Sequence, residues 1–319
     1  MMTLATPTLI TRDLIQVVDL SATEITHLFA LASRMKADYS AYAGSLAQRS
    51  LVMLFEKPSL RTRVSFELGF QKLGGGVSFL DHQASPIGVR ETVEDYAQNL
   101  SRWVDVVAIR CRSHHLLTQF AAASSVPVIN ALSDLHHPCQ ALADIFTLLE
   151  SGIPIEQLHL VWVGDGNNVC HSLIETIATL GGRMTVITPS TYRPPAEVLR
   201  VADGRSCRSG ARIVCTDDLD AVKGADAIYT DVWISMGEES QTVEKTALLA
   251  PYQVNAELMR RAGANARFMH CLPAKRGEEV TADVIDSSAS IVLDQAENRM
   301  HVQNALMLAL LRPDIALRI

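Results

Sequence analysis

The sequence predicts an α/β protein of two domains, each a mostly parallel sheet flanked by helices. Short apolar runs alternate with amphipathic segments along nearly the whole chain. Runs that are apolar on both faces are typical of parallel strands covered by helices. The 319 residues are too many for one ordinary core and suit two domains of about 150 residues each. The hydrophobic content of 48% supports a core of that size.

The strands and helices are predicted from this alternation. Buried strands are expected at residues 50–55, 104–110, 126–131, 158–164, 183–189, 212–216, 226–232 and 267–271. Helices are expected between them, at residues 115–124, 140–150, 168–180 and 254–262. A strand–helix alternation of this kind indicates parallel sheets.

The domain boundary is predicted near residues 150–157. Gly152 and Pro154 end the preceding helix, and a new strand follows. We therefore expect one domain over residues 1–150 and another over residues 151–319.

The last predicted helix covers residues 298–311. Its apolar residues are spaced to form one stripe, which consists of Val302, Ala305, Leu306, Ala309 and Leu310. This stripe predicts a C-terminal helix that crosses the boundary and packs back on the N-terminal domain.

Composition excludes several classes of protein. The net charge of -7 and the pI of about 5.8 argue against a nucleic-acid partner, which would need a basic face. No run of about 18 apolar residues appears, so no membrane span is expected. The six cysteines form no C-x-x-C pair, and the N-terminus lacks a basic stretch followed by an apolar core. These features favour a reducing, cytoplasmic location.

An anion site is predicted in the motif FEKPSLRTRVSFE, residues 55–67, which directly follows a strand. Pro58 and Ser59 suit the start of a helix, whose free N–H groups attract anions. Arg61 and Arg63 lie within that first turn, and arginine binds phosphate oxygens bidentately.

A solvated basic turn is the alternative interpretation of this motif, with Glu56 and Glu67 as ion-pair partners of the arginines. The position between a buried strand and a helix start favours the anion site.

Two further groups follow predicted strands. Arg110 ends the strand at 104–110, and ligands of open α/β sheets bind outside such carboxyl ends. In the motif HHPCQ, His137 and Gln140 are three residues apart and share a helix face. His136 and Cys139 suggest a metal site, but their spacing matches no usual zinc set and no second cluster completes four ligands. No metal is therefore expected.

The motif VWVGDGNNVCHSL, residues 161–173, predicts a strand, a glycine turn and a helix. A dinucleotide site would need a third glycine where this chain has Val169, so that interpretation fails. Asn167 and Asn168 can instead bond the α-carboxylate of an amino acid. An asparagine-rich turn without a ligand fits equally well.

Three motifs complete the set: DVWISMGEE at 231–239, FMHCLPAKRGEEV at 268–280 and NRMHVQNA at 298–305. Each is weak when taken alone. Asp231 fits a helix cap, Cys271 fits a small buried hydrophobe, and Arg299 fits a solvated helix end.

Together and in this order, the motifs resemble those of the aspartate and ornithine carbamoyltransferases, over residues 10–311 or so. SLRTR, Arg110 with His114 four residues on, and HPCQ resemble the family's carbamoyl-phosphate site. The D-x-x-x-S-M-G loop and H-C-L-P resemble the ornithine-binding side, because aspartate enzymes carry a different, basic loop there.

The resemblance implies a carbamoyl-phosphate site and its residues. Phosphate would be bound by Ser59, the backbone of Leu60, Arg61, Thr62 and Arg63. The carbamoyl end would be bound by Arg110, His137 and Gln140, together with Cys271, Leu272 and Arg299.

The resemblance also implies an ornithine site. Asp231 would lie beside the side-chain amine of ornithine. The α-amino acid end of ornithine would be held by Asn168, Ser235 and Met236. The catalytic residues implied are Arg110, His137, Asp231, Cys271 and Arg299.

The implied reaction transfers the carbamoyl group of carbamoyl phosphate to the side-chain amine of L-ornithine. The products are L-citrulline and phosphate, and the pathway is arginine biosynthesis. No redox or covalent step is needed, so no cofactor or metal is expected. Two alternatives stay open: a carbamoyltransferase for putrescine, lysine or an acylated ornithine, and a non-catalytic Rossmann-like binding module.

The sequence departs from the family's pattern at two places. The family usually has threonine where this chain has Leu60. Without the hydroxyl, Leu60 would contact the phosphate through its backbone N–H. The loop at residues 81–91 resembles one that reaches a neighbouring subunit's site, and Pro86 stands where ornithine enzymes often carry glutamine or histidine. Pro86 cannot donate a hydrogen bond, so Gln83 is the candidate substitute.

The resemblance implies a homo-oligomer, expected to be a homotrimer with the carbamoyl-phosphate domains around its axis.

Overall fold

The computed structural model describes residues 12–234 and 242–316. The chain divides into two compact units, Met1–Phe146 with Asn298–Ile319, and Thr147–Glu297. Both divisions fall inside helices, α5 (Pro138–Leu149) and α11 (Val292–Leu311). Each unit contains its own parallel sheet.

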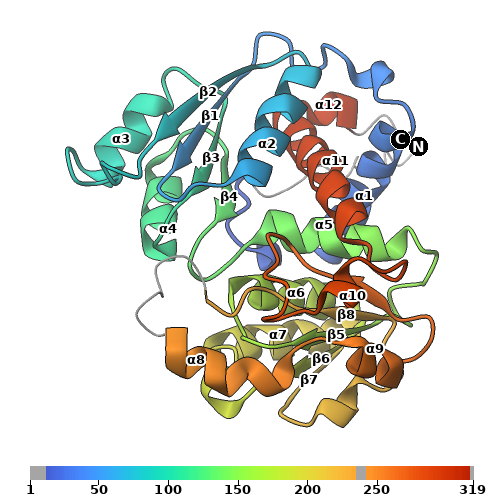
Figure 1. Cartoon of the computed structure of the whole chain (residues 1–319). Coiled ribbons are helices and arrows are strands. Elements are labelled where there is room, and N and C mark those ends of the chain that lie inside the picture. Colours follow the sequence, from blue (N-terminus) through green and yellow to red (C-terminus); the bar gives the residue numbers. More distant parts are fainter. Residues whose placement is uncertain (1–11, 235–241, 317–319) are drawn as a thin grey trace. The chain divides into compact units, whose positions relative to one another are not determined.

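The first unit is built on four parallel strands (Figure 1). They are β1 (Ser50–Phe55), β2 (Gly76–Asp81), β3 (Val106–Arg110) and β4 (Val128–Leu132), in the order β2-β1-β3-β4. The chain passes from β1 to β2 on one side and returns to β3 on the other. The strand order therefore reverses between β1 and β3, the position where open α/β sheets bind ligands.

Helices enclose this sheet, and their side chains form its core. They are α1 (Ala22–Ala37), α2 (Leu60–Lys72), α3 (Val93–Leu100), α4 (His114–Ala123), α5, α11 and α12 (Pro313–Ala316). Leu100 of α3 and Phe120 of α4 pack in one cluster with Leu54 of β1 and Ile109 of β3. Burial of these apolar side chains fixes α3 and α4 on one face of the sheet.

The second unit has five parallel strands in the order β7-β6-β5-β8-β9. They are β5 (His159–Val163), β6 (Arg183–Ile187), β7 (Arg212–Thr216), β8 (Ala227–Tyr229) and β9 (Arg267–Met269). The helices are α6 (Asn168–Leu180), α7 (Ala196–Ser209), α8 (Thr242–Leu249), α9 (Ala256–Ala262) and α10 (Ala282–Ile285). Here the strand order reverses between β5 and β8.

Short 3₁₀ helices occupy several connections. They are Val17–Asp19, Ser40–Tyr42, Ser190–Tyr192, Leu219–Val222 and Ala250–Tyr252. Within the described parts of the chain, no helix combines the length and the apolarity that a membrane span needs.

All eight predicted strands are present. A further strand, β2, was not predicted. Its residues alternate between half-buried and exposed because β2 is an edge strand of its sheet. A search for runs that are apolar on both faces cannot find such a strand. The strand at residues 212–216 was predicted to be buried, and this was wrong. It is β7, which is also an edge strand and is only partly buried.

The C-terminal helix packs back on the first domain, as predicted, but its predicted start at residue 298 was wrong. The helix begins at Val292, and after this residue the next buried positions are polar, since Gln295 and Asn298 are fully buried. An apolar stripe therefore marks only its later turns. Within the first unit, Arg299 Nη2 donates to Thr62 Oγ1 at 2.9 Å, and Asn304 lies against Gly69 of α2.

Two helical glycines test this packing. A Cβ on Gly69 would lie 2.3 Å from Asn304 Oδ1, whereas a Cβ on Gly204 of α7 would meet nothing within 4 Å. We expect Gly69→Ala to lower the free energy of unfolding by about 1–3 kcal/mol, because the buried Asn304 must move. Gly204→Ala should raise it by about 0.5–1 kcal/mol through helix propensity. Urea unfolding of both variants measures this, and equal shifts of one sign would contradict it.

Candidate functional site

The predicted residues of the first unit gather where its strand order reverses. The motif at 55–67 follows β1, Arg110 is the last residue of β3, and His137 and Gln140 lie at the start of α5, after β4. β1, β3 and β4 are neighbours in the sheet, so their carboxyl ends share one edge.

The start of α2 is capped by Ser59. Its Oγ accepts a hydrogen bond from Thr62 N at 3.3 Å and donates to Thr62 Oγ1 at 3.0 Å. The N–H groups of Leu60 and Arg61, in the first turn, have no acceptor within the helix. The Leu60 side chain is 74% exposed, so any ligand contact from Leu60 uses the backbone.

The two arginines of the motif differ. Arg61 is half-buried and has no hydrogen-bond or ion-pair partner among the described residues. Arg63 is exposed, with Nε 3.2 Å from Glu67 Oε2 and its guanidinium 3.9 Å from the centre of the Phe79 ring. The alternative of a solvated ion pair therefore fits Arg63, while Arg61 keeps its charge available for an anion.

Glu56 is not the ion-pair partner that this alternative required. Its buried carboxylate accepts hydrogen bonds from Ile87 N at 3.1 Å and Arg112 N at 2.9 Å. Glu56 N also donates to Arg110 O at 2.8 Å. Glu56 thus fixes the backbone on both sides of Cys111 beside the end of β3.

His137, Arg110 and Arg299 form a buried cluster, here called the arginine cluster. Their exposed fractions are 4%, 6% and 3%. Burial, followed by the charges of Arg299 and then Arg110, lowers the pKa of His137 well below its usual value. His137 is therefore neutral at neutral pH. The cluster offers two guanidinium groups and one neutral N–H donor, a set that suits an oxygen with developing negative charge.

Gln140 supplies a buried acceptor. Its Nε2 donates to Asp144 Oδ1 at 2.8 Å, while Oε1 is fully buried and has no partner among the described residues. An unsatisfied buried carbonyl oxygen indicates a ligand that donates N–H or O–H groups.

Gln83, the candidate substitute in the loop at 81–91, folds onto its own loop. Its backbone N and its Nε2 donate to Oδ1 and Oδ2 of Asp81, at 2.9 Å and 3.0 Å. Within one chain, this side chain is held by Asp81.

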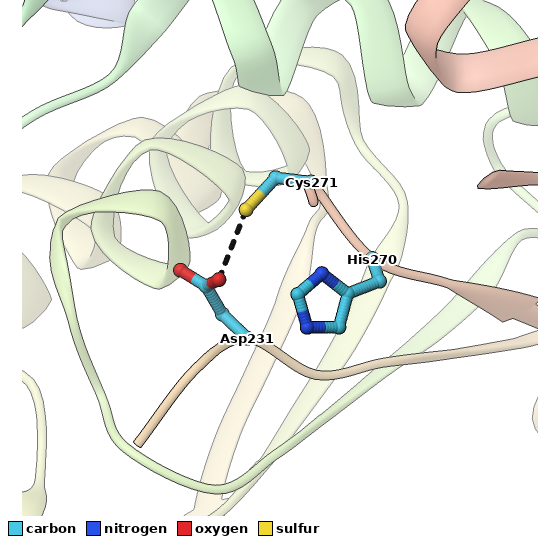
Figure 2. A group of neighbouring side chains, drawn as sticks. All are labelled: Asp231, His270 and Cys271. Atoms are coloured by element: carbon cyan, nitrogen blue, oxygen red, sulfur yellow. Dashed lines mark hydrogen bonds between the residues drawn. The ribbon is translucent and has the colours of Figure 1, made fainter. Parts of the chain in front are cut away.

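The predicted residues of the second unit also gather where the strand order reverses. Asn167 follows β5, Asp231 follows β8 and Cys271 follows β9, and these three strands are neighbours. Cys271 Sγ donates to Asp231 Oδ1 at 3.0 Å (Figure 2). The structure thus brings together Asp231 and Cys271, two of the catalytic residues that the resemblance implies.

The glycine turn after β5 is fixed by backbone sterics and by one buried ion pair. Gly164 has φ of +122°, and a Cβ on Gly166 would lie 2.6 Å from Tyr192 O. Between them, Asp165 Oδ2 lies 2.8 Å from Nζ of Lys245 in α8, with both side chains buried. Sequence reasoning missed Lys245, because a lysine in an amphipathic helix is usually exposed.

The two asparagines of the turn have different surroundings. Asn167 is the N-cap of α6, with Oδ1 accepting from Val169 N at 3.0 Å and Cys170 N at 3.3 Å. Its Nδ2 donates to Asp231 Oδ2 at 2.8 Å. Asn168, the predicted ligand residue, is half-buried in the first turn of α6. Asn167 therefore caps α6 with its side-chain oxygen and binds Asp231 with its side-chain nitrogen.

His270 holds the segment that carries Cys271. Its Nδ1 accepts from Leu272 N at 2.8 Å, so in the neutral ring the proton is on Nε2, 3.2 Å from Glu279 Oε1. His270 N also donates to Gln295 Oε1 at 3.0 Å. These bonds hold Leu272 at φ of +59°, an uncommon conformation for leucine. Nothing in the local sequence signals Glu279 or Gln295.

Asp231, His270 and Cys271 also have the geometry of a three-ligand metal set, with donor atoms within 4.8 Å of one another. Both ring nitrogens of His270 are already hydrogen-bonded, so an ion would have to displace Leu272 N or Glu279. His136 and Cys139 belong to no such group within the described residues. Burial raises the pKa of the Cys139 thiol to about 12, and the His136 ring packs 5.0 Å from that of His114.

The predicted ornithine-site residues Ser235 and Met236 lie outside the described residues. Of the same motif, the structure describes residues 231–234, which include the predicted site residue Asp231.

The lowered pKa of His137 predicts a pH dependence of stability. Below pH of about 6.5 the unfolded chain takes up a proton at His137 that the folded chain does not, so stability falls as the pH falls. His137→Gln should reduce this slope by at most about 1.4 kcal/mol per pH unit. Urea midpoints of both proteins at pH 7.5 and 5.5 measure the difference. Identical slopes would mean that His137 is not held neutral.

Comparisons with known proteins match both halves of the chain. Residues 12–150 match the carbamoyl-P binding domain of aspartate/ornithine carbamoyltransferase, and residues 156–310 match its Asp/Orn binding domain. The ornithine carbamoyltransferase of Shewanella oneidensis is 50% identical over 299 residues, which is 94% of this chain and 99% of the relative. That of Hyperthermus butylicus is 46% identical over 309 residues, 95% and 98% of the two chains.

Solved structures agree. The ornithine carbamoyltransferase from Pyrococcus furiosus is 44% identical and superposes with a TM-score of 0.92, over 96% of this chain and 98% of that one. The anabolic enzyme from Campylobacter jejuni is 34% identical with a TM-score of 0.88, over 94% and 99%. Sequence and fold lead to one conclusion: the chain belongs to the aspartate/ornithine carbamoyltransferase family.

Proposed function

We propose that this chain transfers the carbamoyl group of carbamoyl phosphate to the side-chain amine of L-ornithine, forming L-citrulline and phosphate in arginine biosynthesis. The observation that carries this choice is the buried carboxylate of Asp231, which is hydrogen-bonded to Cys271. A fixed negative charge suits the ammonium side chain of ornithine. It would repel the side-chain carboxylate of aspartate, the substrate of the other branch of the family.

Carbamoyl phosphate is assigned to the first unit, within the expected domain of residues 1–150. Arg61 and the N–H groups at the start of α2 bind the phosphate, together with Ser59, Leu60 and Thr62. Arg63 joins them by leaving Glu67, a weak surface ion pair of the kind worth at most about 1 kcal/mol.

The arginine cluster acts on the carbamoyl group. Gln140 Oε1 accepts a hydrogen bond from the carbamoyl NH₂, which satisfies its buried oxygen. Arg110, His137 and Arg299 donate to the carbonyl oxygen as charge builds there in the transition state. Because these donors are buried and held in place, little reorganisation is needed during the reaction.

Ornithine is assigned to the second unit, within residues 151–319. An alkyl ammonium has a pKa of about 10.4, so at pH 7.5 its neutral, nucleophilic form is disfavoured by about 4 kcal/mol. Asp231 orients the side-chain nitrogen, and Cys271 and the Leu272 carbonyl aim its lone pair at the carbamoyl carbon. Asn168, Ser235 and Met236 hold the α-amino acid end.

The reaction is a balanced group transfer. The amine nitrogen forms a bond to the carbamoyl carbon, the bond from that carbon to the phosphate oxygen breaks, and the proton lost by the amine passes to the departing phosphate. No electron acceptor or covalent enzyme intermediate enters this balance. The expectation that no cofactor or metal takes part stays a prediction.

A homotrimer in the cytoplasm is the proposed state of the chain. Three apolar side chains on one face of α2, Leu60, Val64 and Leu68, are 74%, 40% and 47% exposed. Such a stripe on a helix of the first unit suits contact with another copy. All six cysteines are free thiols, the state that a reducing compartment maintains.

The proposed activity is tested by citrulline formation from carbamoyl phosphate, with ornithine, putrescine, lysine, acetylornithine and aspartate offered in parallel. Ornithine should give the highest kcat/KM. Faster reaction with another amine would keep the carbamoyl-phosphate site and reject the ornithine assignment. If no amine gave a product, the chain would be a non-catalytic binding protein with this fold.

Arg61 and Arg63 provide a matched pair of variants for the same assay. Arg61→Ala should lower kcat/KM for carbamoyl phosphate about 10- to 150-fold, the range for losing charged hydrogen bonds. Arg63→Ala should cost less, because its side chain already has partners in Glu67 and Phe79. Equal activity of Arg61→Ala and the unmodified chain would refute the phosphate role of Arg61.

The assembly is tested by light scattering. The chain should have a mass three times its 34.8 kDa. Leu68→Glu should lower that mass by placing a charge on the apolar stripe of α2. Leu293→Glu, at a site that is 76% exposed on α11, should leave it unchanged. A single-chain mass for the unmodified protein would contradict the trimer.

A further inference from the structure

Asn167 makes two kinds of contact with one amide group. Its Oδ1 caps α6 through Val169 N and Cys170 N, at 3.0 Å and 3.3 Å. Its Nδ2 donates to Asp231 Oδ2 at 2.8 Å. The cap fixes the amide relative to α6, and the fixed amide in turn fixes the carboxylate.

Among the described residues, the hydrogen bonds of Asp231 leave room for one more donor. A carboxylate offers about four lone-pair positions, two on each oxygen. Oδ1 accepts from Cys271 Sγ at 3.0 Å and from Val232 N at 2.8 Å. Oδ2 accepts from Asn167 alone among the described residues. The remaining acceptor position is therefore on Oδ2, and its direction is set by the bond to Asn167.

We infer that Asn167 is a positioning residue, which turns the open lone pair of Asp231 Oδ2 toward the side-chain amine of ornithine. This inference rests on the proposed function. The amide does not need to touch the substrate, because it acts through Asp231.

The double contact explains why asparagine stands at this N-cap. Serine and aspartate cap a helix as well as asparagine does. Aspartate keeps no donor for Asp231 and would add a like charge beside it. Serine keeps only one hydroxyl, on a side chain one bond shorter than that of asparagine, and the same oxygen must cap the helix. A residue needed only for the helix would therefore tolerate both, whereas a positioning residue would tolerate neither.

The test uses Asn167→Ser and Asn167→Asp, with citrulline formation as the readout. We expect kcat/KM for ornithine to fall about 10- to 150-fold, the range for one hydrogen bond to a charged group. KM for carbamoyl phosphate and the melting temperature should stay near those of the unmodified chain. Asn255, which caps α9 through Leu258 N at 3.0 Å, is the matched control. Asn255→Ser and Asn255→Asp should keep full activity.

A second measurement separates positioning from folding. In an Asp231→Asn background, Asn167→Ser should cause no further loss of kcat/KM for ornithine, because the group it orients is already changed. Additive losses would overturn the inference, and so would unmodified kinetics in both Asn167 variants. If the unmodified chain makes no citrulline from ornithine, the proposed function itself fails, and the inference fails with it.

Discussion

The candidate site depends on one constraint of parallel sheets: the carboxyl ends of neighbouring strands lie at the same edge. In each unit the strand order reverses once, between β1 and β3 and between β5 and β8. At these points the connections leave in opposite directions, so the edge stays open to a ligand. Arg61 follows β1 and Arg110 ends β3, while Asn167 follows β5 and Asp231 follows β8. The contact between Asn167 and Asp231 follows directly from this arrangement.

The two sites use opposite electrostatics. In the first unit, burial and then the charges of Arg299 and Arg110 lower the pKa of His137, so this histidine can donate a hydrogen bond without adding a third charge. In the second unit, a buried carboxylate is held by an amide, a thiol and a backbone N–H. The first arrangement suits an anion and a developing oxyanion, and the second suits a cationic amine. Two substrates of unlike charge can thus be distinguished by one chain.

Buried polar residues connect these sites to the scaffold. Thr62 joins the cap of α2 to Arg299 of α11. Glu56 fixes the backbone beside Arg110, and His270 with Glu279 fixes the segment that carries Cys271 and Leu272. Since an unsatisfied buried polar group is costly, each of these bonds restricts the residue it supports. Of these supporting residues, Glu56, His270 and Glu279 have no part in the proposed chemistry and serve only to orient the proposed catalytic groups.

The sequence by itself determined the fold class, eight of the strands, and the polar motifs that lie at the carboxyl ends of strands. These features depend on apolar periodicity and on residue types at strand ends, which are local properties. Only the tertiary structure decided that Arg63 pairs with Glu67 while Arg61 pairs with none of the described residues, and that Asn167 is hydrogen-bonded to Asp231. It also revealed the edge strand β2, the early start of α11, and the roles of Lys245, Glu279 and Gln295. Their partners are distant in sequence, and no local pattern encodes which distant group a polar side chain will meet.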